Sequence, residues 1–227
     1  KRYRSNLSFD HGMQYISPKS KSFKIFIQDL YNKKILKIWN GNHLDFTFKK
    51  DNEIKFIGKK SNNDICKYQL KKIKQHYNSS VIKIDRYKNY WEITLKNNKK
   101  YQSKSLVLTC PYPQLKKLAK KYLNKKLLNL NVKMHPNITA MLVVKNHKEI
   151  PLSSIKTDTD VISWIANENS KKIFRSPLGL WTLQSSVKWA NKNINKYKKK
   201  TRSTKFFLIS EFCKLIGFNK NEVIFSN

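Results

Sequence analysis

A short segment near the N-terminus, Phe9–Ile16, places a carboxylate, an imidazole, an amide and a phenol around one glycine. Glycine is scarce in this sequence, with five among 227 residues, so Gly12 predicts a backbone position that a Cβ would obstruct or against which a ligand lies. The alternative is a tight turn between a strand and a helix. For His11 the alternative is a structural histidine, because one histidine without a paired carboxylate specifies no acid–base chemistry.

The charge of the chain raises a second class of function. The formal net charge is +34, from 48 Lys and Arg against 14 Asp and Glu, and such an excess favours a nucleic-acid-binding module. Only five of the 48 basic residues are arginine, whose forked donors suit base and phosphate recognition. The lysines are also spread over the whole length, as a compositional bias would spread them. Nucleic acid is therefore not the expected partner, although a nucleic-acid-binding module stays open as the alternative.

Cysteine, histidine and hydropathy patterns indicate the compartment and exclude other classes. Three cysteines far apart, without a C-x-x-C pair, predict free thiols and a cytoplasmic protein. The five histidines lack the spacing of metal ligands, so no metal is expected. The longest apolar runs are too short for a membrane span. Because the sequence does not begin with Met, we expect a piece of a longer chain.

The elements that would position the N-terminal segment follow from periodicity. Apolar residues at helical spacing predict a helix over 23–30, and short apolar runs predict strands at 35–39, 44–48 and 54–57. A capping pattern at Ser61 predicts a second helix, and its apolar face would carry Cys66, Leu70, Ile73 and Tyr77.

Further along, alternating residues predict a β-meander with strands at 81–84 and 90–95 and a turn at Asn97-Asn98. A buried strand at 105–109 and a helix begun by Pro113 would follow. A second sheet is expected from strands at 138–145, 160–166 and 180–184. The remaining expectations are a solvated lysine loop at 192–200, a helix from Ser203 that buries Phe206, Ile209, Phe212, Cys213 and Ile216, and a strand from Glu222.

Three segments, in order, resemble the renalase-like FAD/NAD(P)-dependent oxidoreductases, a branch of the flavin amine-oxidase superfamily. They are FDHGMQYISPKSKSF (9–23), LVLTCPYPQL (106–115) and SWIANENSK (163–171), the last followed by LWTLQSSVKW (180–189). The resemblance implies FAD as cofactor and hydride transfer to the flavin from a small reduced substrate such as a nicotinamide species.

The same resemblance assigns residues to the site. The implied cofactor-binding residues are Asp10, His11, Gly12, Met13, Gln14, Val81, Thr109, Cys110 and Pro111. The implied substrate residues are Trp164, Asn167, Ser170, Lys171, Trp181 and Gln184. His11 and Gln14 are the catalytic candidates. Strand core or turn is the alternative for the segment at 81 and 109–111, and a tryptophan at strand period is often a core residue.

The implied fold class is α/β (α+β mixed). It combines a partial FAD-binding Rossmann-like domain, with an inserted β-meander, and a substrate domain built on a mostly antiparallel sheet. The expected boundaries are 1–16 and 52–115 for the FAD domain, 17–51 and 116–202 for the substrate domain, and 203–227 for the start of the return to the FAD domain.

One motif of that family does not occur in the sequence. No G-x-G-x-x-G is present, although flavin enzymes of this kind bind the pyrophosphate with such a loop. We expect that unit before Lys1 and a second flavin-contacting segment after Asn227, so this fragment would be inactive alone. A degenerate remnant that keeps the fold without the cofactor is the remaining alternative.

Overall fold

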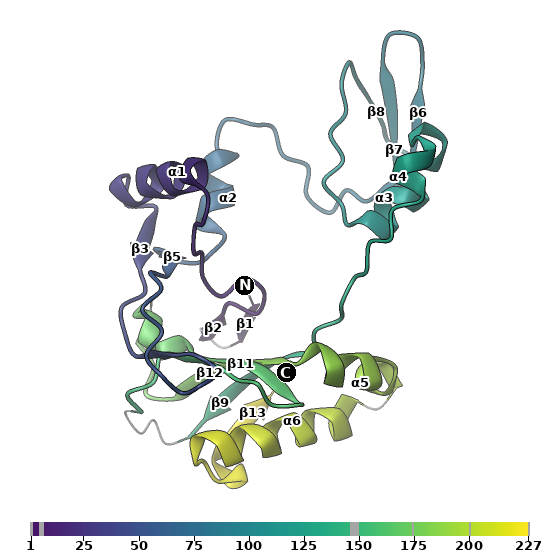
Figure 1. Cartoon of the computed structure of the whole chain (residues 1–227). Helices are drawn as coiled ribbons and strands as arrows, with labels where there is room; N and C mark the ends of the chain where they lie inside the picture. The colour runs from purple at the N-terminus through teal and green to yellow at the C-terminus, as the bar shows by residue number, and fades with distance from the viewer. Residues whose placement is uncertain (1, 5–6, 146–149, 174, 200, 227) are drawn as a thin grey trace. The chain divides into compact units, whose positions relative to one another are not determined.

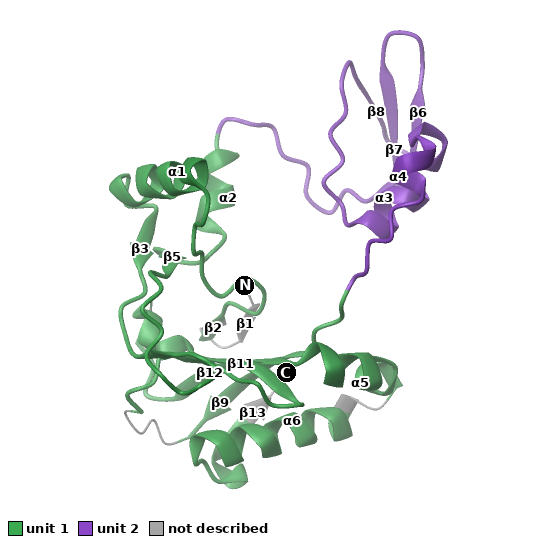
Figure 2. Cartoon of the chain, viewed as in Figure 1, with its two compact units in different colours: residues 1–71, 135–227 green, residues 72–134 purple. Residues whose placement is uncertain are grey.

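The computed structural model describes residues 2–4, 7–145, 150–173, 175–199 and 201–226. They form two compact units, which Figure 1 traces along the chain and Figure 2 distinguishes by colour. Unit 1 consists of residues 1–71 and 135–227, and unit 2 of residues 72–134. Helices accompany several sheets whose strands are mostly antiparallel, which confirms the predicted mixed α/β class. The domain boundaries expected from the sequence separate an FAD-binding from a substrate-binding domain, and that division stays a prediction.

A six-stranded sheet organises unit 1, in the order β13-β9-β12-β11-β10-β4. Neighbouring strands are antiparallel except β10 and β4, which run parallel. The strands predicted near 138–145, 160–166 and 180–184 are confirmed as three adjacent members of this sheet. The strands are β4 (His43–Leu44), β9 (Thr139–Val144), β10 (Ser154–Lys156), β11 (Ile162–Asn167), β12 (Gly179–Ser185) and β13 (Val223–Ser226).

Helices α5 (Val187–Lys199) and α6 (Thr201–Ile216) cover one face of this sheet (Figure 1). Alternate strand residues point into this layer because side chains alternate between the faces of a strand. Trp181 of β12 and Phe212 of α6 are both buried there, with ring centroids 5.5 Å apart. The largest apolar cluster of the described chain lies in this layer, and it leaves the opposite face of the sheet for other contacts.

The rest of unit 1 contains two small sheets and two helices. The sheets pair β1 (Arg2–Arg4) with β2 (Leu7–Phe9) and β3 (Leu36–Ile38) with β5 (Phe56–Gly58). Helix α1 (Lys21–Asn32) confirms the helix predicted at 23–30, and it buries Ile27 and Leu30 against β3 and β5. The short elements are α2 (Asp64–Gln69), η2 (Glu168–Lys171) and η3 (Lys220–Glu222).

His43 joins the edge strand β4 to the core. Its Nδ1 lies 2.7 Å from the Ser154 hydroxyl and its Nε2 2.8 Å from the Trp39 carbonyl oxygen. A carbonyl only accepts, so Nε2–H donates to it, and a neutral ring accepts at Nδ1 from the Ser154 hydroxyl. Burial lowers the pKa of His43, and the hydrogen bond to the Trp39 carbonyl opposes that shift.

This arrangement predicts a pH dependence of stability. A lowered pKa in the folded state means that the unfolded chain binds the proton more readily, so stability is retained above the ordinary histidine pKa and lost as the pH falls below about 6.5. We expect the free energy of unfolding to fall between pH 6.5 and 5.5, by at most about 1 kcal/mol. Urea unfolding at several pH values measures it. His43→Gln should flatten this dependence, and an equally steep profile in that variant would contradict the assignment.

Unit 2 consists of a β-meander and short helices. Strands β6 (Val81–Arg86), β7 (Trp91–Leu95) and β8 (Lys100–Ser103) pair in sequence order. Strands β6 and β7 confirm the strands predicted at 81–84 and 90–95, whereas β8 was not predicted. Asn98 adopts a left-handed φ of 63° in the turn before β8, which confirms the turn expected at Asn97-Asn98. The helices are α3 (Tyr112–Ala119), which begins one residue before the predicted Pro113 and has that proline in its first turn, η1 (Lys120–Tyr122) and α4 (Lys125–Leu128).

Two predicted strands are wrong. Residues 105–109 form no strand, and Val107 is 84% exposed, because no described strand pairs with this apolar run. The run at 44–48 ends as a strand at Leu44, since the Asp45 carboxylate accepts hydrogen bonds from the amides of Thr47 and Lys49 and forms a turn instead.

The helix predictions also need correction. The helix after Ser61 ends at Gln69, and the four residues of its predicted apolar face are exposed: Cys66, Leu70, Ile73 and Tyr77. The lysine run at 192–199 is helical in α5, and Lys200 lies outside the described residues. Lysine is a good helix former, and Ala190, Ile194 and Tyr197 supply a stripe that contacts the core.

Helix α6 begins at Thr201, two residues before the predicted cap at Ser203. Its buried face includes Phe212 and Cys213 as predicted, but Leu208 is buried and Phe206 is 60% exposed. Gly217 ends the helix with a left-handed φ of 83°.

Candidate functional site

The face of the six-stranded sheet opposite α5 and α6 carries most of the predicted site residues. In the β11–β12 register Trp164 lies opposite Gln184, and Ala166 opposite Thr182, so these four side chains share one face. The N-terminal segment lies against the same face (Figure 1). Phe9 packs on Met141 and Leu180 of that face, and Ile16 pairs with Phe56 of β5 through two backbone hydrogen bonds of 2.8 Å. Both ends of the segment are therefore anchored.

A buried group of polar side chains joins this segment to η2 and β12. We call it the Lys171 cluster: Asp10, Gln14, Glu168, Lys171 and Thr182. The Lys171 ammonium lies 2.9 Å from a Glu168 carboxylate oxygen, 3.1 Å from Gln14 Oε1 and 3.5 Å from an Asp10 carboxylate oxygen. The Thr182 hydroxyl donates to Glu168 at 2.6 Å, and the Gln14 amide donates to the Asp10 carbonyl.

The ionisable groups of the Lys171 cluster are two carboxyl groups and one ammonium group. Burial raises the pKa of Glu168, while the charge of Lys171 and the Thr182 hydrogen bond oppose the rise. Two carboxyl groups thus share one ammonium group in the interior. These contacts fix the segment at 10–14 against η2 and β12.

Further hydrogen bonds hold the backbone between Asp10 and Gln14. The Gln184 amide donates to the Gly12 carbonyl at 2.9 Å. The Asn62 amide donates to the carbonyls of Met13 at 2.7 Å and Gln14 at 3.1 Å. Two of the resembling segments, 9–23 and 180–189, are thus in direct contact.

One of the two roles expected of Gly12, a backbone position that a Cβ would obstruct, does not apply within the folded chain. No atom lies within 4 Å of the position that a Cβ would occupy, so the folded chain itself does not require glycine here. Two other described glycines have that constraint: a Cβ on Gly58 would lie 1.7 Å from the Ser61 carbonyl oxygen, and one on Gly41 would lie 1.9 Å from the Ser153 hydroxyl oxygen. The surroundings of Gly12 are open and Met13 is 51% exposed, so this part of the segment is accessible to a ligand.

Aromatic side chains border the same region. The rings of Tyr15 and Trp164 lie 5.4 Å apart, and the buried Lys55 ammonium lies 5.1 Å from the Tyr15 ring. Burial raises the pKa of Tyr15, against the charge of Lys156. The buried indole N–H of Trp164 has no hydrogen-bond partner among the described residues.

The other predicted substrate residues have packing or bridging positions. Trp181 lies on the opposite face of the sheet, in the layer with α5 and α6. Ser170 accepts a hydrogen bond from the Trp39 indole at 2.9 Å and donates to the Asn167 carbonyl at 2.6 Å. The Asn167 side chain accepts from the amide of Asn169 and so caps η2.

His11 borders a cavity of about 200 Å³ that β9 and α5 complete. Its other lining residues include Asn137, Thr139 and Tyr197. His11 therefore places an imidazole ring at the border of a small, partly open cavity.

Four predicted cofactor residues lie in unit 2. Val81 begins β6 and is exposed. Thr109 and Pro111 are exposed and Cys110 is half-buried, in the stretch that leads into α3. Within unit 2 these four residues occupy a strand start and an irregular stretch, and their role in binding stays a prediction.

Sequence reasoning missed several residues of the site. Glu168 lies in the resembling segment, three residues before Lys171, and acidic residues are rare in this chain, so its spacing to a lysine was a usable signal. Thr182, Trp39 and Asn62 carried no such signal, because their contacts join segments far apart in the sequence.

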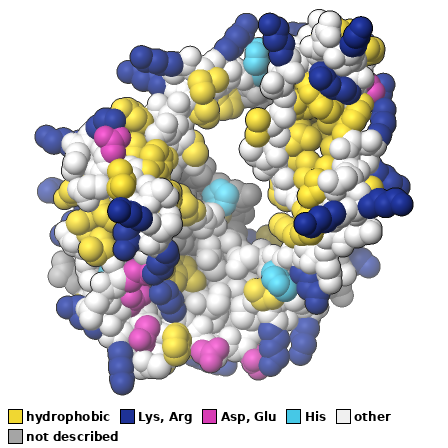
Figure 3. Space-filling view, turned by 45° about the horizontal axis from the view of Figure 1, so that its top comes forward, with side chains coloured by type: hydrophobic (Ala, Val, Ile, Leu, Met, Phe, Trp, Pro, Cys, Tyr) yellow, Lys and Arg dark blue, Asp and Glu magenta, His cyan; other side chains and the backbone are white. Residues whose placement is uncertain are grey.

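The described residues give little support for a metal site, a membrane-spanning helix or a nucleic-acid-binding surface. No group of three or more His, Cys, Asp or Glu side chains there has an arrangement that could hold a metal ion. None of the described helices combines the length and apolar character needed to cross a membrane. Lys and Arg side chains are dispersed over the face drawn in Figure 3, with no single basic patch on it. All three cysteines are free thiols.

Sequence comparisons return no relative. No family model matches the chain. No curated protein matches it either.

Solved structures do resemble the chain. A variant of putrescine oxidase matches with a TM-score of 0.59 and 11% identity, over 77% of this chain and 39% of that one. A protein assigned as a protoporphyrinogen oxidase from Exiguobacterium sp. 255-15 matches with a TM-score of 0.51 and 9% identity, over 80% of this chain and 40% of that one. Tetracycline destructase Tet(51) matches with a TM-score of 0.50 and 10% identity, over 97% of this chain and 60% of that one.

The chain thus spans about two fifths of the length of the two oxidases and three fifths of the destructase. At these identities the likeness concerns the fold. The chain has a mixed α/β fold of the kind found in these oxidoreductases.

Proposed function

We propose that this chain is part of a FAD-dependent oxidoreductase, similar to renalase and the amine oxidases, that oxidises a small reduced substrate by hydride transfer to the flavin. The observation that carries the proposal is the contact between the segment at 10–14 and the residues from Glu168 to Gln184 on the open face of the sheet. Two segments that resemble the family by sequence meet there, in a fold found in oxidases.

The segment at 10–14 fits one end of a flavin. Its backbone is exposed at Gly12 and Met13, and the open space at Gly12 leaves room for a flat ring against the peptide. In unit 1 the residues proposed to hold the cofactor are Asp10, His11, Gly12, Met13 and Gln14. The resemblance proposes the same role for Val81, Thr109, Cys110 and Pro111 within unit 2. When bound, the flavin accepts the hydride, and the protein supplies orientation and excludes water.

The side chains around this segment have separate proposed roles. Gln14 is engaged with Lys171 and the Asp10 carbonyl, so it positions the segment. His11 is the residue proposed to hold or move a proton, because imidazole titrates near neutral pH and its ring borders a cavity. Trp164 and Tyr15 provide an apolar wall for a substrate such as a reduced nicotinamide.

Flavin uptake tests the proposal. The chain is expressed and its visible spectrum is recorded before and after addition of FAD. The proposal expects the absorption bands of bound flavin after this addition. A folded protein that stays colourless would contradict it and favour the non-catalytic remnant. Salt-sensitive binding of duplex DNA without flavin would favour the nucleic-acid-binding alternative.

The substitution Gly12→Ala separates ligand approach from folding. Because no protein atom lies within 4 Å of the added methyl group, we expect the free energy of unfolding to change by less than about 0.5 kcal/mol. A flavin lying against this peptide would meet the methyl group, so its dissociation constant should rise about tenfold or more. Fluorescence titration with FAD measures the affinity, and an unchanged dissociation constant would place the flavin elsewhere.

A further inference from the structure

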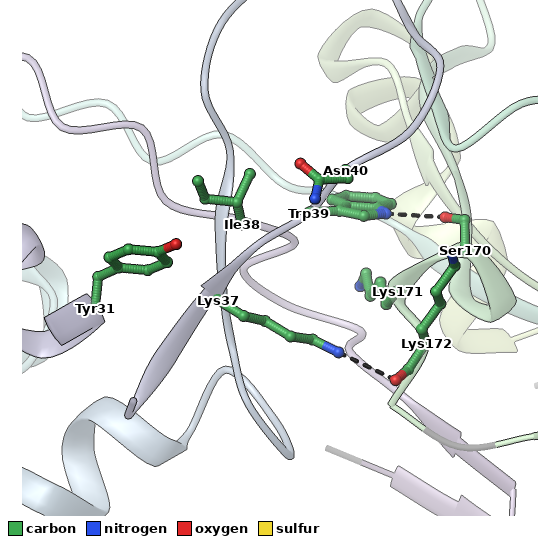
Figure 4. Close-up of a pocket in the computed structure, with 8 residues that line it drawn as sticks. All are labelled: Tyr31, Lys37, Ile38, Trp39, Asn40, Ser170, Lys171 and Lys172. Atoms are coloured by element: carbon green, nitrogen blue, oxygen red, sulfur yellow. Dashed lines mark hydrogen bonds between the residues drawn. The ribbon is translucent and has the colours of Figure 1, made fainter. Parts of the chain in front are cut away.

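A second cavity of unit 1, of about 350 Å³, lies between β3 and η2 (Figure 4). Its charged lining residues are all cationic: Lys37, Lys171 and Lys172. Tyr31 and Ile38 supply apolar surface, and Asn40 supplies an amide. Since no carboxylate lines the cavity, its own walls do not balance the positive charge.

The three lysines differ in the contacts that their ammonium groups make. The Lys171 ammonium is buried, pairs with the Glu168 carboxylate and donates a hydrogen bond to Gln14. The Lys37 ammonium donates to the Lys172 carbonyl at 3.1 Å, as the dashed line in Figure 4 marks, and this bond fixes its position beside the cavity. Burial lowers the pKa of Lys37, and the charge of Lys172 lowers it further. An anion in the cavity would therefore relieve an unfavourable concentration of positive charge.

The backbone at Lys172 contributes to this geometry. Lys172 adopts a left-handed φ of 50° at the end of η2, a conformation that lysine rarely takes. Its carbonyl oxygen accepts a hydrogen bond from Lys37, and Lys172 is also one of the residues that line the cavity in Figure 4. Two cationic side chains from segments 135 residues apart in the sequence thus border one cavity.

We propose that this cavity binds a small aromatic carboxylate, with the carboxylate on Lys37 and Lys172 and the ring against Tyr31 and Ile38. Charge-assisted hydrogen bonds from two ammonium groups suit a carboxylate. The volume is near the lower end for ligand cavities and favours a single small ring. This site goes beyond the proposed function, because it requires no flavin and its anion-binding residues are not among those assigned to the oxidoreductase site.

Titration calorimetry of the full chain with benzoate, benzamide and benzylamine at low ionic strength tests this site. Benzoate should bind at least about tenfold more tightly than the neutral benzamide, because only benzoate offers a charged acceptor. Benzylamine should show no binding, and added salt should weaken benzoate. No benzoate binding, or equal affinity for benzoate and benzamide, would overturn the proposal. FAD is absent from this experiment, so its failure leaves the proposed function untouched.

Substitutions of the lysines that line the cavity test whether benzoate binds there. Lys37→Met and Lys172→Asn should each weaken benzoate about tenfold, whereas Lys37→Arg keeps the charge and should retain most of the affinity. Lys34→Asn is the matched control, since Lys34 is an exposed lysine with a left-handed φ of 58° that does not line the cavity. Asparagine tolerates this backbone conformation in both variants. If all four variants bind benzoate like the unaltered chain, the attraction comes from the general positive charge and the proposal is wrong.

Discussion

Replacing Lys171 by methionine should lower the free energy of unfolding by about 3–5 kcal/mol, because the change leaves buried carboxylates without their cation. Lys171 is fully buried, and its ammonium contacts both Asp10 and Glu168. Methionine keeps the length of the side chain but none of its charge. Urea unfolding monitored by tryptophan fluorescence measures the loss.

The loss should depend on pH in a defined direction. Without Lys171 only the Thr182 hydrogen bond opposes the burial that raises the pKa of Glu168, so the folded variant binds a proton more readily than the unfolded one. Stability then rises as the pH falls toward the ordinary glutamate pKa, and the deficit of the variant should shrink between pH 7 and 5. Adding Glu168→Gln to Lys171→Met should recover part of the loss at pH 7.

A surface lysine is the control for this effect. Lys188 pairs with Asp160 at 2.8 Å, but both side chains are more than half exposed. Lys188→Met should therefore change stability by less than about 1 kcal/mol and show no such pH trend. Equal losses in the two variants would mean that the Lys171 cluster does not stabilise the segment at 10–14.

Part of the site was predictable from the sequence because the relevant residues occupy two short segments. The resemblance assigned Asp10 and Gln14 to the cofactor and Lys171 to the substrate, and the structure brings these three side chains into contact. Glu168 and Thr182 were not assigned, although they complete the same cluster. Their importance depends on burial, and burial of a polar residue is a property of the folded sheet that a local pattern does not carry.

The same limit explains the success and failure of the fold predictions. Strands β9, β11 and β12 were predictable because each carries β-favouring residues and finds a partner strand in the described chain. The run at 105–109 has the same local character without a partner strand, and it remains irregular. Helix α5 was missed because its lysines dominate the composition, whereas its core contacts come from the few apolar residues between them.

Trp181→Ala should also cost about 3–5 kcal/mol, because it removes the largest fully buried side chain of the core. The sequence assigns Trp181 to the substrate site by the same resemblance as Trp164, yet the two rings lie on opposite faces of the sheet. Trp181 contacts Phe212 and Phe218, with ring centroids 5.5 and 6.0 Å away.

The control and the ligand measurement distinguish a core residue from a binding residue. Phe206→Ala, at a 60% exposed aromatic residue of α6, should change the free energy of unfolding by less than about 0.5 kcal/mol. Under conditions where Trp181→Ala remains folded, its affinity for FAD and for benzoate should equal that of the unaltered chain, since Trp181 faces the helices. A selective loss of FAD affinity without a loss of stability would return Trp181 to the binding site, and it would place a ligand between the sheet and α6.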